Sequence, residues 1–219
     1  MEILITDVTE MSAGMYCVAG WDAANKRMVR PLPDGSHWPE ALIAKYKIMP
    51  GVVLSATPQG QATGALPHLT EDTPMNSASI RAIQSSPNWT GSGAPGVSRS
   101  LDEGFAGNLR WNSTFRDVYQ GVYVATGTKC DSLGAVNVGN ANLSFIELFD
   151  RLKAVLNDGT ARYQLPVSSH LFKDAWRKGG LAGATSLLPK RDILHVRVGL
   201  ARDFEGQPNK CYLMINGIL

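Results

Sequence analysis

The chain has 219 residues, of which 44% are hydrophobic and 18% are charged, and its formal net charge is +2. This composition excludes a disordered chain, because the apolar mass is ample for a core, and the small net charge excludes a protein whose overall charge would drive binding to a polyanion. The 22 glycines indicate many turns, as in β-rich folds. No apolar run approaches the about 18 residues of a membrane helix, and no signal peptide is recognisable. We therefore expect a cytoplasmic protein without membrane association.

β-rich segments separated by close turns open the chain and favour an antiparallel meander, at residues 3–9, 16–21 and 27–32. A helical pattern over residues 39–47 and an apolar strand at 51–56 follow. Three strands, a helix and a further strand appear in this order in oligonucleotide/oligosaccharide-binding (OB) barrels. A short helix is also expected over residues 77–84. We predict a first OB-like barrel over residues 1–84.

Ser, Gly and Pro dominate residues 85–100, a composition typical of linkers and long loops. We place a linker or long loop over residues 85–110. Long irregular loops of this kind in compact domains are usually functional or mobile.

The remainder of the chain alternates strands with helical patterns. Strands are expected at residues 118–126, 133–138, 163–167, 193–200 and 210–218. The clearest helical pattern covers residues 144–156, where Ser144 and Glu147 form a capping box ahead of an apolar face. A second helix begins at Ser169 and ends at Gly179-Gly180. We predict a second OB-like barrel with inserted helices over residues 111–219, so the fold class is mainly β with inserted helices in two small OB-like β-barrels.

Basic residues concentrate in the second part of the chain. Residues 162–202 contain eight Lys or Arg and two Asp, which is a modest electrostatic footprint for a polyanion or else a solvated basic face. The candidate nucleic-acid-binding residues of this part are Lys173, Arg177, Lys178, Lys190, Arg191 and Arg197. Trp89, in the Ser/Gly-rich stretch, is the best exposed aromatic candidate, since aromatic rings stack on bases.

One polar cluster has the residue types of a catalytic site. His68, Glu71 and Asp72 lie within five residues and are suited to acid/base chemistry or cation binding, although a capped turn would use the same residues. Arg30, at the end of an expected strand, either binds a phosphate or carboxylate through two hydrogen bonds or pairs with Asp7 or Asp22 across the sheet. These four residues are catalytic candidates, and Arg30 is also a candidate for nucleic-acid binding.

Several common catalytic patterns are missing from the sequence. There is no Gly-rich phosphate loop, no Cys-x-x-Cys, no His-Glu-x-x-His and no Gly-x-Ser-x-Gly. The three cysteines are widely spaced, which favours reduced thiols over a metal knuckle. We expect no cofactor and no metal site.

Four blocks in fixed order resemble a poorly characterised bacterial family, the dual OB-containing nucleic-acid-modification proteins. They are Ile3–Thr9 with Tyr16–Gly20, then Met28–Leu32, then Pro67–Asp72, and finally Arg197–Leu200 with Cys211–Ile218. The resemblance spans nearly the whole chain and implies two OB-like barrels, a link to nucleic acids and a role in phage defence. It implies no catalytic residues.

Three hypotheses for function follow. The first is an accessory protein for nucleic-acid binding or modification, with single-stranded DNA or RNA as the partner. The second is an enzyme acting on a nucleotide or nucleic acid through His68, Glu71, Asp72 and Arg30. The third is an interaction module of a multi-protein complex, with a protein as the partner.

Overall fold

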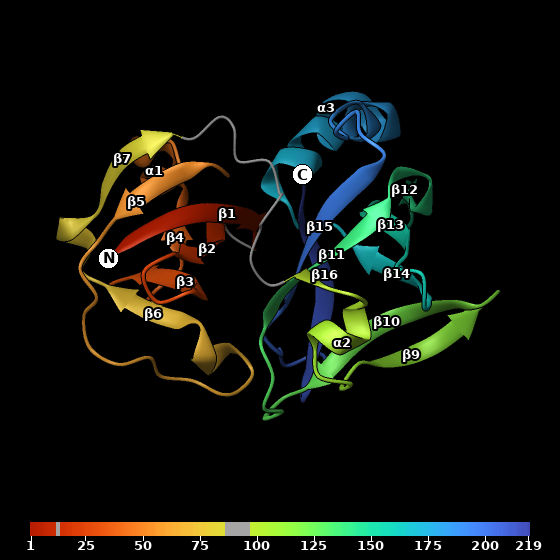
Figure 1. The fold of residues 1–219 in the computed structure, drawn as a ribbon, viewed down its shortest axis with the longest axis horizontal. Helices are drawn as coiled ribbons and strands as arrows, with labels where there is room; N and C mark the ends of the chain where they lie inside the picture. Colours follow the sequence, from red (N-terminus) through yellow and green to blue (C-terminus); the bar gives the residue numbers. More distant parts are fainter. Residues whose placement is uncertain (12–13, 86–96) are drawn as a thin grey trace. The chain divides into compact units, whose positions relative to one another are not determined.

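The computed structural model describes residues 1–11, 14–85 and 97–219, with the side chains of residues 84 and 85 left aside. The chain divides into two compact units. The first comprises Met1–Gly64 with Leu69–Pro95, and the second comprises Ala65–His68 with Gly96–Leu219. Strands predominate in both units, which are coloured red to yellow and green to blue in Figure 1. The predicted fold class, mainly β with inserted helices, is confirmed.

The first unit follows the strand order of an OB fold. Its elements are β1 (Glu2–Glu10), β2 (Met15–Asp22), β3 (Arg27–Pro33), β4 (Trp38–Pro39), α1 (Glu40–Tyr46), β5 (Val52–Ser55), β6 (Asp72–Met75), η2 (Ser77–Ser79) and β7 (Arg81–Ser85). Strands β1, β2 and β3 form an antiparallel meander, and β5 returns after α1 to pair with β1. Strand β6 runs parallel to β3, whereas β7 runs antiparallel to β5. The segment from β6 to β7 therefore bridges β3 and β5, as the fifth strand of an OB barrel does.

The apolar residues of these strands make one core. Alternate residues of β1 and β2 are buried together with Trp38, whose indole Nε1 donates a 2.7 Å hydrogen bond to the carbonyl oxygen of Pro31. Helix α1 contributes Ile43, and its C-cap Lys47 has a φ of 49°. At Gly20, a Cβ atom would lie 2.6 Å from the carbonyl oxygen of Leu4, so the close approach of β1 and β2 requires glycine there.

The second unit is larger. The 3₁₀ turn η1 (His68–Thr70) begins where the second unit meets the first along the chain. The remaining elements of the second unit are β8 (Val97–Ser98), α2 (Leu101–Gly104), β9 (Arg110–Phe115), β10 (Val118–Ala125), β11 (Leu133–Gly139), η3 (Asn140–Asn142), β12 (Leu143–Glu147), β13 (Leu152–Asn157), β14 (Arg162–Pro166), α3 (His170–Ser186), β15 (Ile193–Leu200) and β16 (Lys210–Ile218).

The same OB order is present in this unit, with additions. Strands β11 and β12 act as one bent first strand, because β12 pairs with β13 while β11 pairs with β15. Strand β14 completes the meander, α3 follows, and β15 and β16 are the last two strands. An isolated parallel bridge between Val167 and Ile215 joins the third strand to the fifth. The additions are β8, α2 and the hairpin β9–β10. Both units thus have the predicted OB-like architecture.

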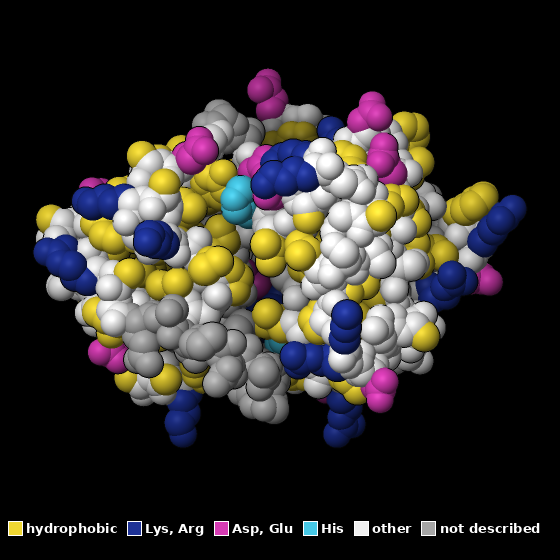
Figure 2. All heavy atoms as spheres, turned by 90° about the horizontal axis from the view of Figure 1, so that it is seen from above, with side chains coloured by type: hydrophobic (Ala, Val, Ile, Leu, Met, Phe, Trp, Pro, Cys, Tyr) yellow, Lys and Arg dark blue, Asp and Glu magenta, His cyan; other side chains and the backbone are white. Residues whose placement is uncertain are grey.

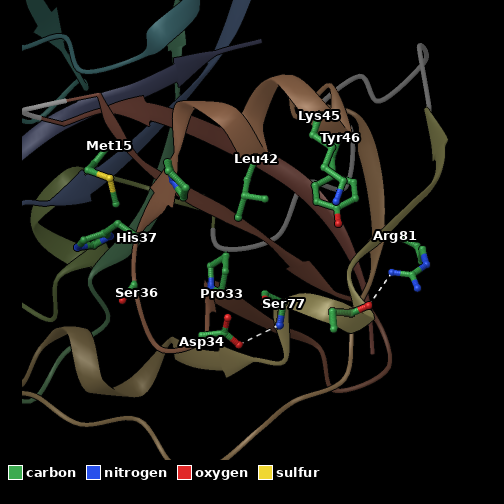
Figure 3. A pocket seen from close by; sticks show the side chains of 12 residues that line it. Met15, Pro33, Asp34, Ser36, His37, Leu42, Lys45, Tyr46, Ser77 and Arg81 are labelled. Carbon is green, nitrogen blue, oxygen red and sulfur yellow. Dashed lines mark hydrogen bonds between the residues drawn. The ribbon is translucent and has the colours of Figure 1, made fainter.

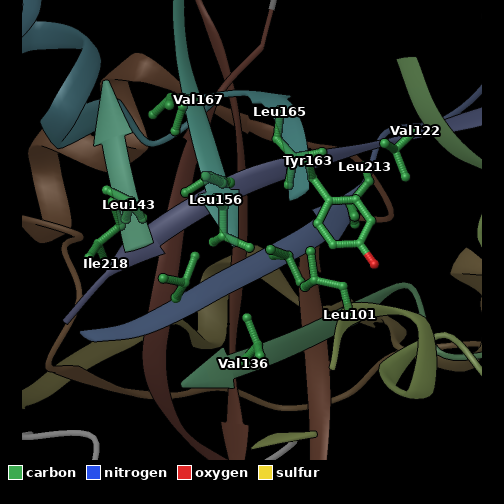
Figure 4. Packing of buried hydrophobic residues seen from close by; sticks show 14 of the residues in the cluster. Leu101, Val122, Val136, Leu143, Leu156, Tyr163, Leu165, Val167, Leu213 and Ile218 are labelled. Carbon is green, nitrogen blue, oxygen red and sulfur yellow. The ribbon is translucent and has the colours of Figure 1, made fainter. Parts of the chain in front are cut away.

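Buried side chains from all of these strands form the core of the second unit. Leu156, Leu165 and Leu213 are fully buried, and Figure 4 shows them with Tyr163 and Leu101 at the centre of the packing. Helix α3 inserts Phe172, whose ring lies 5.5 Å from that of Phe145.

The helix predicted over residues 144–156 is wrong. This segment forms the hairpin β12–β13, in which the pairing aligns Phe145 with Ala154. Leu152, Ala154 and Leu156 alternate with half-buried residues, which is the period of a strand. The turn is made without glycine by Phe149 and Asp150, both with a φ of 54°. Because type I′ turns usually carry Asn or Gly here, the turn left no signal in the sequence.

Three further expectations, including the end of the second helix at Gly179-Gly180, differ from the structure. The short helix expected over residues 77–84 is a single 3₁₀ turn, η2, followed by β7. Residues 97–110 of the predicted linker fold as β8, α2 and the start of β9 in the second unit, because Leu101 and Phe105 are buried in its core. The helix α3 continues to Ser186 across a kink at Gly179 and Gly180. In the described part of the chain, no helix is both long and apolar enough to cross a membrane.

Candidate nucleic-acid interface

The outer face of β13 and β14 is polar and basic. Buried Ala154, Leu156 and Leu165 fix the inner face, so the alternate residues point outward. The outward residues are Lys153, Val155, Asn157, Arg162 and Gln164. In an OB fold this is the face of strands 2 and 3, on which oligonucleotides lie. The added hairpin β9–β10 extends the face, because β10 pairs in parallel with β14 and sets Gln120 beside Gln164.

The charge of this face is positive. Lys153 is flanked by Arg151. The pKa of the Lys153 ammonium group is lowered, mainly by its partial burial and to a smaller extent by the positive charge of Arg151. Arg162 is exposed opposite Asn157. Lys153 and Arg162 lie on two strands that contain no carboxylate, which favours an anionic ligand.

A cluster of two tyrosines and a lysine lies where β10 pairs with β16. Tyr123 and Tyr212 are direct partners in the ladder, and their ring centroids are 5.8 Å apart. Lys210 Nζ lies 4.7 Å from the centroid of the Tyr123 ring and donates a 2.8 Å hydrogen bond to Asn112 Oδ1. Asn112 Nδ2 in turn donates to the Tyr212 hydroxyl, which donates to Gln207 Oε1, each over 3.0 Å. We call these five residues the tyrosine–lysine cluster.

The cluster has ordered aromatic rings and a cation held in place by hydrogen bonds. Its neighbours in the ladder, Val124 and Cys211, are buried, so the rings point away from the core. Arg110 on β9 stands opposite Tyr123 and adds an exposed cation. Rings that stack on bases beside a cation that pairs with phosphate are the elements of single-strand recognition.

Each of three hairpin ends of the second unit carries an exposed phenylalanine. Phe149, between β12 and β13, is 82% exposed, and Phe204, between β15 and β16, is also exposed. These two loops correspond to the loops that flank the ligand face of an OB fold. Phe115 ends β9, and the guanidinium carbon of Arg116 lies 5.2 Å from its ring centroid.

The four catalytic candidates lie in buried structural positions. Arg30 Nη1 donates a 2.7 Å hydrogen bond to Asp72 Oδ1, in a pair that joins β3 to β6 at directly aligned positions. Glu71 accepts a hydrogen bond from Thr70 Oγ1. His68 belongs to the second unit, where its Nε2 lies 2.9 Å from the carbonyl oxygen of Leu200. All four residues are at most 6% exposed.

The predicted basic residues are spread over α3 and the chain that follows it. Lys173, Arg177 and Lys178 lie on α3, and Lys178 pairs with Asp174. Lys190 and Arg191 are exposed between α3 and β15, whereas Arg197 is fully buried. Trp89 lies outside the described residues. On the face seen in Figure 2, Lys and Arg side chains are interspersed with uncharged and hydrophobic ones, so no broad basic area dominates that face.

The tyrosine–lysine cluster was not found from the sequence. Lys210 and Tyr212 alternate with buried residues in a predicted strand, which marks them as outward-facing. Their contact with Tyr123 and Asn112 depends on the pairing of distant strands, and the sequence does not encode that pairing locally.

Comparisons with known proteins give little further guidance. No family model matches the chain, and no curated protein matches it. Among solved structures, the p204 HINb domain is similar at 10% sequence identity and a TM-score of 0.33, covering 98% of this chain and 95% of that one. The tetrameric p202 HIN2 is similar at 8% identity and a TM-score of 0.33, covering 100% of this chain and 91% of that one. The fold assignment above rests on strand pairing.

Proposed function

We propose that the second unit binds single-stranded nucleic acid along the outer face of β13, β14, β10 and β16. The observation that carries the proposal is the tyrosine–lysine cluster, in which hydrogen bonds hold the Tyr212 hydroxyl and the Lys210 ammonium group, and the Tyr123 ring packs against both. The OB strand order supports it, because oligonucleotides bind to this face in OB folds.

Different residues of the face contact the phosphates, the base rings and the base edges. Lys210, Lys153, Arg162 and Arg110 pair with phosphates and give the affinity its dependence on salt. Tyr123 and Tyr212 stack on bases, which contributes about 1–3 kcal/mol per base without selecting a sequence. The amides of Gln120, Gln164 and Asn157 donate and accept hydrogen bonds at base edges. The site therefore favours unpaired strands, whose bases are free to stack.

Fluorescence anisotropy with labelled single-stranded DNA, RNA and duplex DNA at two salt concentrations tests the proposal. We expect tighter binding to the single strands than to the duplex. Lys210→Gln should reduce the slope of log affinity against log salt by about 0.7, the value for one phosphate contact on a single strand. Tyr212→Leu should weaken binding about tenfold at both salt concentrations, since it removes one stacking ring.

Lys129→Gln is the matched control for these variants. Lys129 is an exposed lysine of the same unit, outside the proposed face, and its replacement should change neither affinity nor salt slope. Equal losses for Lys129→Gln and Lys210→Gln, or no binding of single strands by the wild-type protein at low salt, would sink the proposal.

The resemblance found in the sequence motivates a finer proposal, a role in phage defence as an accessory of nucleic-acid modification. Its test is the efficiency of plating of phage on cells carrying the complete gene neighbourhood, with either the wild-type chain or the Lys210→Gln/Tyr212→Leu double variant. We expect protection with the wild type and loss of protection with the double variant at equal protein levels. Retained protection would separate the defence role from strand binding.

A further inference from the structure

The first unit has a pocket of about 800 Å³ between α1, the chain between β3 and β4, and η2 (Figure 3). This volume lies within the range of small-molecule sites, about 300–1,000 Å³. All of its lining residues belong to the first unit. The pocket is therefore separate from the proposed strand-binding face, and none of the four catalytic candidates lines it.

The middle of the pocket is apolar. Leu42 from α1 and Pro33 from the end of β3 lie at its centre, with Met15 at one side. Side chains of this kind provide a surface for a flat ring, and Tyr46 adds an aromatic side chain.

Two cations lie at one end of the pocket. Lys45 Nζ is 4.9 Å from the centroid of the Tyr46 ring. Arg81 Nη1 donates hydrogen bonds to the carbonyl oxygens of Ala78 and Ile80, over 2.8 and 2.7 Å, which fixes the guanidinium at the pocket wall. A fixed guanidinium with an ammonium group in the same pocket is the donor set that proteins use for phosphate.

A carboxylate lies on a different side of Leu42 from Lys45 and Tyr46, as Figure 3 shows. Asp34 has a φ of 48°, and its Oδ1 accepts a 3.1 Å hydrogen bond from the backbone N–H of Ser77. Hydrogen bonding from Ser77 lowers the pKa of this carboxyl group, so it is ionised at neutral pH. An ionised carboxylate accepts hydrogen bonds and offers none, so it favours a ligand that presents a hydrogen-bond donor, such as an amino group, at that end.

From this geometry we infer that the pocket binds a nucleoside monophosphate whose base carries an exocyclic amino group. The phosphate pairs with Lys45 and Arg81, the base lies on Leu42 and Pro33, and its amino group donates to Asp34. The pocket has two cations and one carboxylate, which complements a ligand with a dianionic phosphate and a neutral amine edge.

Isothermal titration of the full chain with AMP, CMP, UMP, adenosine and inorganic phosphate tests the inference. We expect AMP and CMP to bind at least tenfold more tightly than UMP, because the uracil ring presents a carbonyl where cytosine has its amino group. Adenosine and inorganic phosphate alone should each bind at least tenfold more weakly than AMP, because each lacks one half of the contacts. Arg81→Gln should weaken AMP about tenfold or more, as loss of a charge-assisted hydrogen bond does.

Asp34→Asn is the most discriminating variant. Asparagine tolerates the left-handed backbone of this position and keeps an oxygen for the Ser77 N–H, so the fold is retained and an unchanged melting curve verifies this. Its amide also donates, so the preference for CMP over UMP should shrink to within about threefold.

Three outcomes would overturn the inference. They are no heat of binding with any nucleotide at millimolar concentration, inorganic phosphate binding as tightly as AMP, or a CMP preference that Asp34→Asn leaves intact. The Lys210→Gln/Tyr212→Leu variant separates this site from the strand-binding face. It should bind AMP with wild-type affinity whether or not the strand-binding proposal holds.

Discussion

The two units follow one strand order but close their barrels differently. In the first unit, β6 pairs in parallel with β3 and β7 pairs antiparallel with β5, so the fifth-strand segment is paired at both ends. In the second unit, the third and fifth strands meet at the single bridge between Val167 and Ile215, and β10 pairs with portions of both β14 and β16. The closed barrel presents a pocket beside its helix, whereas the opened barrel presents an extended face with rings and cations.

The polar groups that hold the two barrels also differ. The first buries a complete ion pair, Arg30 with Asp72, at the seam between β3 and β6. The second holds its added helix α2 with a lone carboxylate, Asp158, which accepts hydrogen bonds from the backbone N–H groups of Leu101 and Ala161. Removing one partner of the buried ion pair should therefore strongly destabilise the first unit. The contribution of Asp158 to the stability of the second unit should instead depend on pH.

The largest expected effect comes from breaking the ion pair. Arg30→Ala leaves the buried carboxylate of Asp72 without its cation and should lower the free energy of unfolding of the first unit by about 3–5 kcal/mol. Hydrogen exchange followed by mass spectrometry measures this unit by unit. Peptides from β2 and β3 should lose protection, while those from β14 and β15 keep it.

Two further variants control this prediction. Arg27→Ala, on the same strand, removes a half-exposed arginine 4.0 Å from the buried carboxylate of Asp22. Because Asp22 keeps its hydrogen bonds from Asn25, this variant should cost less than about 1 kcal/mol. The double variant Arg30→Met/Asp72→Leu removes both charges and should cost less than Arg30→Ala. If Arg27→Ala and Arg30→Ala are equally destabilising, the seam does not depend on the pair.

A smaller effect is expected in the second unit. Burial opposes ionisation of Asp158, but hydrogen bonds from Leu101, Thr160 and Ala161 outweigh it and lower the pKa of the carboxyl group below its usual 3.8. A folded-state pKa below the unfolded value stabilises the fold above the unfolded pKa, and this stabilisation is lost as pH falls through the folded pKa. Asp158→Asn keeps one acceptor oxygen of two and should cost about 1–3 kcal/mol at neutral pH.

Urea unfolding as a function of pH measures both consequences. The wild-type chain should lose stability as the pH falls from about 4 downward, and Asp158→Asn should flatten that dependence. Asp131→Asn, at an exposed position, serves as the control and should leave the wild-type curve unchanged. A pH dependence identical in Asp158→Asn and wild type would show that α2 is held by something else.

The part of the fold that the sequence predicted is the part encoded locally. Strands such as Ile193–Leu200 are rich in apolar and β-branched residues, and α1 and the part of α3 before Gly179 have helical spacing, so these were expected where they occur. The hairpin β12–β13 was misread, because its apolar residues match a helical face equally well and its turn lacks glycine. Arg30 was expected at a strand's end, but it lies in the middle of β3, which continues through Pro33 to pair with β6. Its partner, Asp72, was not among the pairings considered, since the closure of β3 by β6 is a long-range event. The contacts of Lys210 and Tyr212 were missed for the same reason, because they depend on the pairing of strands that are distant in the sequence.

The smallest effect concerns the turn that was misread. Phe149 and Asp150 both occupy the left-handed region, which is costly for a bulky side chain and cheap for asparagine and glycine. Phe149→Asn/Asp150→Gly should therefore raise the free energy of unfolding by up to about 1 kcal/mol, as measured by urea unfolding. If the exposed ring contacts bases, the same variant should bind single strands several-fold more weakly.

Phe149→Leu distinguishes the backbone from the ring. It retains a bulky side chain in the left-handed region, so stability should stay at the wild-type value, while the loss of the aromatic face weakens strand binding as much as the double variant does. A gain of stability with unchanged affinity in Phe149→Asn/Asp150→Gly would mean that the strained turn serves no ligand, and the proposed face would then end at β13. Weakened binding in both variants would instead extend the face from the tyrosine–lysine cluster to the β12–β13 loop, as the OB strand order implies.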